Sequence, residues 1–210
     1  MTYLALGDSI SIDDYTEVKG GGAAAQLAKR LKADEFIDFT RDGAVSGMVL
    51  AELRAAASRE VPKIDAVTLT IGGNDLLSGY FFREKGERGA VQVAFEDFVA
   101  NLSAIAALLN RLECPVILNS IYDPTDGDDA KSAELGLPME ARQTLNAANA
   151  AISEMAAKHG FLFCDLEALF HGHGFWSELP WLVMHIEPNL LGASQIARAW
   201  HQLLTRPNAA

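Results

Sequence analysis

Short apolar runs of β type alternate along this chain with alanine- and leucine-rich segments of helical period. Such alternation is typical of a parallel sheet whose strands are joined by helices. We therefore expect an α/β fold with helices on both faces of the sheet. The expected strands are residues 3–6, 36–39, 66–71, 116–121 and 161–166, and the expected helices are residues 23–31, 48–58, 91–112, 138–159 and 189–204, with Asn189 capping the last.

Size and charge limit the kinds of protein that this chain can be. Its 210 residues, half of them hydrophobic, suffice for one core, and no internal repeat or low-complexity tract divides them. We expect residues 1–210 to form a single domain. A net charge of −11 disfavours nucleic acid and anionic membrane surfaces as partners. No apolar stretch is expected to be long enough to cross a bilayer.

The N-terminus and the cysteines predict where the chain resides. Met1-Thr2-Tyr3 offers no charged leader or cleavable apolar segment before the first strand. Cys114 and Cys164 each adjoin an expected strand, which favours small reduced core residues over a disulfide. We therefore expect a cytoplasmic protein.

Three strand ends carry residues that fit a catalytic site. Gly7-Asp8-Ser9 follows the first strand, where a sharp turn exposes a serine hydroxyl beside free backbone N–H groups. A small-residue loop, residues 42–47, follows the second strand, and its Gly47 lets a ligand oxygen approach a bare N–H. Gly72-Gly73-Asn74-Asp75 follows the third strand and ends in side chains able to hydrogen-bond a substrate. Together the loops supply one nucleophile and two kinds of oxyanion donor.

These blocks resemble those of the SGNH hydrolases, also called GDSL esterases and lipases, and the resemblance spans nearly the whole chain. It implies Ser9 as the nucleophile. It also implies an oxyanion hole made by the N–H groups of Ser9 and Gly47 and by the side-chain amide of Asn74. The implied fold is a flavodoxin-like three-layer α/β/α sandwich with a five-stranded parallel sheet in the order 2-1-3-4-5. No cofactor is implied.

The last block departs from the family pattern of Asp-x-x-His before a proline. Alignment on Pro188 puts Glu187 in the histidine position and Met184 in the aspartate position. His185 lies two residues before Glu187, and residues i and i+2 of an extended segment point to the same side. Because imidazole is the base best matched to serine near neutral pH, His185 is the first candidate. Glu187 is an alternative, either orienting the histidine or acting as the base if burial raises its pKa.

A further histidine candidate lies in the glycine-hinged aromatic segment 170–176. His173, between two glycines, is another alternative base. His171 and His173 are also spaced to bind one metal ion from the same side. No cysteine cluster or His-Glu-x-x-His pattern accompanies them, so we expect a substrate-side lid loop and no metal.

Two insertions after strand ends are expected to shape the pocket. Residues 78–89 carry Tyr80, Phe81 and Phe82, which fit either the lining of an acyl or alkyl site or a helix packed on the domain surface. Residues 123–138 are rich in Asp and Gly.

The predicted function is hydrolysis of a small-molecule carboxylic ester, acetyl esters included, through an acyl-Ser9 intermediate. The altered last block supports one competing hypothesis from another class. In that hypothesis the chain is a binding protein that has kept the fold and lost hydrolysis.

Overall fold

The structure, a computed structural model, describes residues 1–56, 62–84 and 89–206. Its main sheet has five parallel strands in the order β2-β1-β3-β4-β5, as expected. The strands are β1 (Thr2–Gly7), β2 (Glu35–Thr40), β3 (Ala66–Thr70), β4 (Val116–Asn119) and β5 (Leu162–Cys164).

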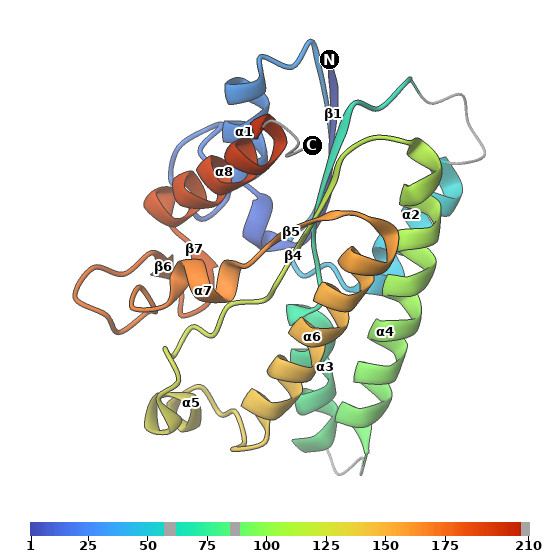
Figure 1. Cartoon of the computed structure of the whole chain (residues 1–210). Helices are drawn as coiled ribbons and strands as arrows, with labels where there is room; N and C mark the ends of the chain where they lie inside the picture. The colour runs from blue at the N-terminus through green and yellow to red at the C-terminus, as the bar shows by residue number, and fades with distance from the viewer. Residues whose placement is uncertain (57–61, 85–88, 207–210) are drawn as a thin grey trace.

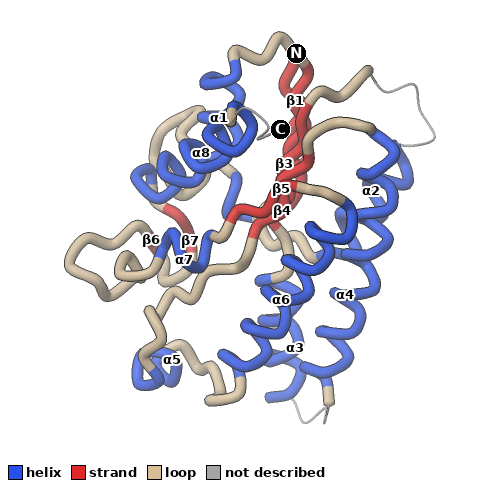
Figure 2. The backbone as a smooth tube through the Cα atoms, in the orientation of Figure 1, coloured by secondary structure: helices blue, strands red, loops and turns tan. Residues whose placement is uncertain are grey.

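Helices cover both faces of the sheet, which gives three layers (Figures 1 and 2). One face carries α1 (Ala23–Leu31) and α8 (Leu190–Thr205), which pack on each other. The other carries α2 (Ser46–Ala56), α4 (Ala90–Leu109) and α6 (Ala141–His159), with α3 (Gly73–Glu84) beside α4. Asn189 caps α8 as expected, because its side chain accepts a hydrogen bond from the Gly192 N–H.

The alternation of side chains along β1 explains the two cores. Leu4 and Leu6 join the cluster under α2, α4 and α6, whereas Tyr3 and Ala5 join the cluster under α1 and α8. A strand buried on both faces reads as a continuous apolar run, which is why sequence pattern alone located it. The Tyr3 hydroxyl is hydrogen-bonded to Thr68 Oγ1 at 2.6 Å, so its polar atom is satisfied in the core.

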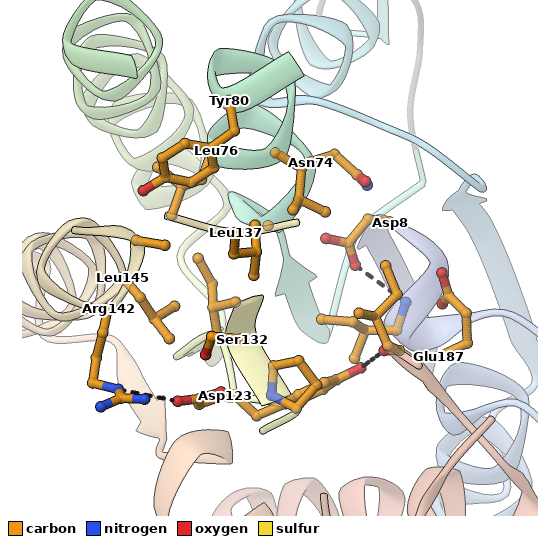
Figure 3. A pocket seen from close by; sticks show the side chains of 18 of the residues that line it. Asp8, Asn74, Leu76, Tyr80, Asp123, Ser132, Leu137, Arg142, Leu145 and Glu187 are labelled. Atoms are coloured by element: carbon orange, nitrogen blue, oxygen red, sulfur yellow. Dashed lines mark hydrogen bonds and ion pairs between the residues drawn. The ribbon is translucent and has the colours of Figure 1, made fainter. Parts of the chain in front are cut away.

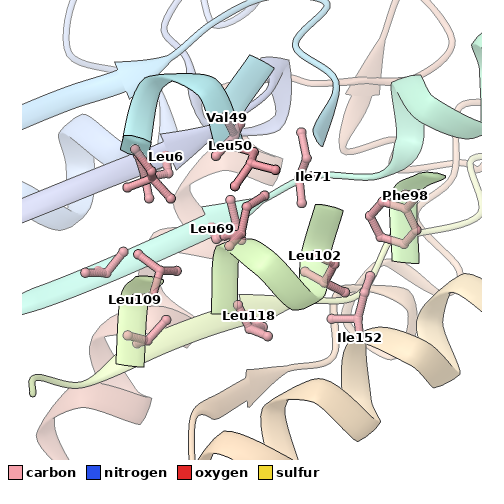
Figure 4. Close-up of a cluster of buried hydrophobic side chains, with 14 of the residues drawn as sticks. Leu6, Val49, Leu50, Leu69, Ile71, Phe98, Leu102, Leu109, Leu118 and Ile152 are labelled. Carbon is pink, nitrogen blue, oxygen red and sulfur yellow. The ribbon is translucent and has the colours of Figure 1, made fainter. Parts of the chain in front are cut away.

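The larger core lies between the sheet and α4 (Figure 4). One face of α4 packs on the sheet and is fully buried there. It carries Phe98, Leu102, Ile105 and Leu109. Burial of each such side chain stabilises the fold by roughly 1.5–3 kcal/mol. This packing holds the carboxyl ends of the strands, and thus the candidate site, on a rigid frame.

The expectation about membrane-spanning length is wrong for one segment. Residues Ala90–Leu112 are long and apolar enough to cross a membrane by length and composition. The segment consists of α4 and the 3-10 turn Asn110–Leu112, and it was predicted as one helix over 91–112. Its 20-residue helix packs against α2, α3 and α6, and Phe98, Leu102, Ile105, Ala106 and Leu109 are its buried residues.

Several short elements were not expected from the sequence. They are α3, α5 (Asp129–Glu134), α7 (Leu166–Phe170) and the two-stranded ribbon of β6 (Leu182–Val183) and β7 (Glu187–Pro188). Helix α5 lies in the second insertion, residues 123–138, whereas α3 begins in the block of residues 72–75 and runs into the first insertion. Cys114 and Cys164 are free thiols, and the expected helix end at Ser58 lies outside the described residues.

Candidate active site

A sharp turn after β1 presents Ser9. Gly7 has a φ of +129°, and a Cβ there would collide with the Thr70 carbonyl oxygen of the neighbouring strand, so the position requires glycine. The chain then enters a 3-10 turn, Ser9–Ser11, which Asp8 caps by accepting a hydrogen bond from the Ile10 N–H at 3.2 Å. The first N–H groups of such a turn have no intrahelical acceptor, so the Ser9 N–H is suited to receive an oxyanion.

The second and third blocks are joined by direct hydrogen bonds. The buried Asp75 carboxylate accepts from the Ser46 N–H, at 3.0 Å to the nearer oxygen, and from the Ser46 hydroxyl at 2.5 Å. The Asn74 side-chain amide donates to the Ala44 carbonyl at 3.1 Å. Because an amide nitrogen carries two hydrogens, Asn74 keeps one donor for a ligand.

Gly47 lies in the first turn of α2 and is exposed. Its N–H is among the helix-start amides that have no intrahelical partner. Gly47 does not line the cavity that Ser9 and Asn74 share. It follows Ser46, which the Asp75 carboxylate holds.

Glu187 shares a cavity with Ser9 and Asn74 (Figure 3). The carboxyl is buried in β7, and burial raises its pKa above the ordinary value, although an interaction with the Ser9 side chain lowers the pKa in part. Its Oε2 atom has no hydrogen-bond partner in the part of the chain that the structure describes. A carboxyl that faces a serine hydroxyl and retains a free oxygen is equipped to accept a proton.

Asp8 and Tyr122 lie close enough to Glu187 to interact with it electrostatically. Asp8 is 2% exposed, and burial raises its pKa to about 7, with smaller contributions from Glu187 and Asp75. The Tyr122 hydroxyl donates to the Ile186 carbonyl at 2.5 Å, and so fixes the backbone just before Glu187. Sequence reasoning missed Tyr122, whose only signal was its position shortly after a predicted strand.

Tyr15 and Asp42 form a polar rim outside the cavity lining. The half-buried Tyr15 interacts with Glu187 and Asp42, and its pKa rises to about 12, mainly through burial. The exposed Asp42 also raises the pKa of Glu187. Neither residue was singled out as functional from the sequence, because an isolated tyrosine or a loop aspartate carries no motif.

The structure does not bring His185 to the cavity. Met184 and His185 have φ angles of +46° and +73°, so the chain turns at the point that was expected to be extended. The exposed His185 ring instead leans on Phe175, with ring centroids 4.5 Å apart. The alternation that was expected to align His185 with Glu187 therefore does not apply.

His173 is also engaged elsewhere. Its ring stacks on Trp181 with centroids 3.8 Å apart, and its Nδ1 atom is 3.1 Å from the Leu179 carbonyl oxygen. His171 is exposed at the end of α7. Across the described ranges, no group of three or more His, Cys, Asp or Glu side chains is arranged to hold a metal ion.

Comparison with known proteins shows the family of this chain. The model of the GDSL-like lipase/acylhydrolase family matches residues 5–193, which is most of the chain. The chain belongs to this family. As a GDSL-like lipase/acylhydrolase, it is a carboxylic ester hydrolase.

Relatives of this GDSL-like chain include both lipases and esterases. It is 28% identical to a lipase from Streptomyces rimosus in an alignment of 221 positions, which covers 86% of this chain and 75% of that protein. The crystal structure of the extracellular lipase from Streptomyces rimosus shares the fold, with a TM-score of 0.62 and 22% identity over 96% of this chain and 99% of that chain. An acetylxylan esterase from Geobacillus stearothermophilus gives a TM-score of 0.72 at 18% identity, over 98% and 94% of the two chains.

Proposed function

We propose that the protein hydrolyses small-molecule carboxylic esters through an acyl-Ser9 intermediate, with Glu187 as the base. The observation that carries the proposal is that Ser9 and the buried Glu187 carboxyl line the same cavity, where the two side chains interact. A carboxylate of ordinary pKa is a poor base toward a hydroxyl. Burial makes Glu187 better matched to the task, because it raises the pKa of the carboxyl.

The reaction divides into two halves. In the first, Ser9 Oγ attacks the ester carbonyl carbon as Glu187 takes the hydroxyl proton, and the oxyanion is held by the N–H groups of Ser9 and Gly47 and by the Asn74 amide. The carbon–alcohol bond then breaks, and Glu187 returns the proton to the departing alcohol. In the second half, Glu187 takes a proton from water, the water oxygen attacks the acyl carbon, and the free acid leaves as Ser9 Oγ regains its proton.

The test is intact-mass analysis after exposure to a fluorophosphonate, which reports an activated serine without knowledge of the substrate. We expect one adduct on the parent protein and none on Ser9→Ala. Ser11→Ala is the matched control, because Ser11 lies in the same turn as Ser9 and its buried hydroxyl is hydrogen-bonded to Thr70. This variant should still be labelled. Labelling that persists in Ser9→Ala would contradict the assignment of the nucleophile.

A second candidate function is a ligand-binding protein that has lost hydrolysis. The specific observation in its favour is the last block, where Met184 and Glu187 occupy the positions of the family's aspartate and histidine. This candidate predicts a folded parent protein that binds ligand in the same cavity and forms no adduct with the fluorophosphonate.

A further inference from the structure

The cavity beside Ser9 extends away from the catalytic groups as a slot between helices. Asp8 and Glu187 lie on one side of it, and Tyr80, Leu145 and Arg142 lie on the opposite side (Figure 3). Both α3 and α6 contribute to its walls. The slot therefore has a catalytic end and a distal end.

The walls between the two ends are apolar. Helix α3 contributes Leu76, Leu77 and Tyr80, and α6 contributes Ala141 and Leu145, one helical turn apart. Sugar hydroxyls that entered this slot would be removed from water without enough partners, which is unfavourable. Methylene groups would gain from the same burial.

A charged cluster lies at the distal end. Arg142 Nε is 3.5 Å from Asp123, and its Nη1 is 2.9 Å from Asp129, so two carboxylates already neutralise the guanidinium. Asp123 and Arg142 both line the slot. An aliphatic chain that reached this cluster would have to desolvate it, which sets a limit on chain length.

The position of Ser9 indicates which part of the ester occupies the slot. Ser9 is only 8% exposed and lines the slot itself, and the acyl group remains bonded to Ser9 Oγ after the alcohol has left. The leaving alcohol and the incoming water need a route to solvent. The polar rim of Tyr15 and Asp42, outside the slot lining, offers that route.

We propose that this slot is an acyl pocket, and that the preferred substrates are esters of unbranched aliphatic acids longer than acetate and short enough to end before the Arg142–Asp123 pair. This inference rests on the proposed function, because it names the substrate class of the same site. Acetylated sugars, which offer one methyl group to the slot, are then poor substrates.

The first experiment compares kcat/KM for 4-nitrophenyl esters of acetic, butanoic, octanoic and hexadecanoic acid. Each buried methylene is worth up to about fourfold, so we expect a rise of at least about tenfold from acetate to octanoate. Hexadecanoate should fall below octanoate because its chain exceeds the slot. A profile that is flat, or highest for acetate, would overturn the acyl-pocket assignment and leave the ester hydrolase function intact.

Filling the slot provides the matched pair of variants. Leu145→Trp should lower kcat/KM for octanoate at least about tenfold more than it lowers kcat/KM for acetate, because only the longer chain reaches Leu145. Asn146→Trp, on the exposed side of α6, should leave both values within about twofold. Equal losses for both esters in Leu145→Trp would contradict the proposal.

Binding without turnover separates this inference from the proposed function. The probe is 2-decanone, a neutral ketone, because a carboxylate product would be repelled by the ionised Glu187. Calorimetry on Ser9→Ala should detect 2-decanone, and adding Leu145→Trp should weaken its binding about tenfold or more. If no ester is hydrolysed but 2-decanone binds as expected, the proposed function is wrong and the apolar slot remains a ligand site. If 2-decanone does not bind, or if Leu145→Trp leaves its binding unchanged, the acyl-pocket assignment is wrong.

Discussion

The buried Glu187 carboxyl lines the same cavity as Ser9 and interacts with the Ser9 side chain, at the position where the family pattern has histidine. A catalytic imidazole needs a second group to fix its tautomer and orientation, whereas a carboxylate has no tautomer to fix. The missing acid at Met184, a residue that is 69% exposed, is therefore consistent with a glutamate base. Glu187 in place of the histidine therefore explains why Met184 can replace the aspartate.

Loss of the Asn74 amide should remove an oxyanion donor. We expect Asn74→Ala to lower kcat about 100-fold or more, since one such donor is typically worth that much. The control is Asn101→Ala, because Asn101 donates to Ser46 Oγ at the start of α2, at 3.0 Å, and does not line the cavity. Steady-state kinetics on both variants is the measurement, and a loss well below tenfold in Asn74→Ala would speak against the donor role.

Tyr122 is expected to act as a positioning residue, since its hydroxyl holds the Ile186 carbonyl next to Glu187. Tyr122→Phe leaves that carbonyl without its partner, so kcat should fall about tenfold and the free energy of unfolding by about 1–3 kcal/mol. Tyr3→Phe is the matched control, because it removes an equally buried hydroxyl that binds Thr68 away from the site. Urea unfolding should show a similar loss of stability in the two variants, and kinetics should show a loss of kcat in Tyr122→Phe alone. An equal loss of kcat in both variants would assign Tyr122 a purely structural role.

Asp8 should make stability depend on pH. Burial raises its pKa from 3.8 to about 7, so the folded state holds a proton that the unfolded state has released. The stabilisation from this protonation is complete below pH 3.8 and is lost as the pH rises through about 7. About 2 kcal/mol of this loss should fall between pH 5.5 and 8.5.

Urea unfolding of Asp8→Asn at these two pH values measures that contribution. The variant should lack this part of the pH dependence, and so gain stability relative to the parent as the pH rises. Asp14→Asn, a change at an exposed aspartate of the same loop region, should keep the dependence of the parent. A parent protein as stable at pH 8.5 as at pH 5.5 would contradict the burial of an ionising Asp8.

Much of the frame could be predicted because its signals are local. Strands buried on both faces, such as β1, read as apolar runs, and the motif Gly7-Asp8-Ser9 marks a turn directly after such a run. Helix α3 was missed because the catalytic block Gly73-Asn74-Asp75 forms its first turn and resembles a loop. Tyr80, one of the aromatic residues singled out beforehand, does line the slot, whereas the side chains of Phe81 and Phe82 lie outside the described part of the structure.

The position of the base was harder to predict because it depends on backbone angles. Positive φ values at Met184 and His185 are uncommon for residues other than glycine and leave no pattern in the sequence. Burial of Glu187 likewise results from the tertiary packing of β7, and no local sequence pattern predicts it.

The identity of the base is tested most directly by the pH dependence of kcat/KM for an octanoate ester in Glu187→Gln and His185→Gln. In the parent protein the rate should rise with pH through the raised pKa of Glu187, because the carboxylate must be ionised to accept the Ser9 proton. Glu187→Gln should lose about 100-fold or more at every pH, and His185→Gln should keep both the rate and the midpoint of the parent. A His185→Gln enzyme that loses activity, beside a Glu187→Gln enzyme that keeps it, would contradict the account.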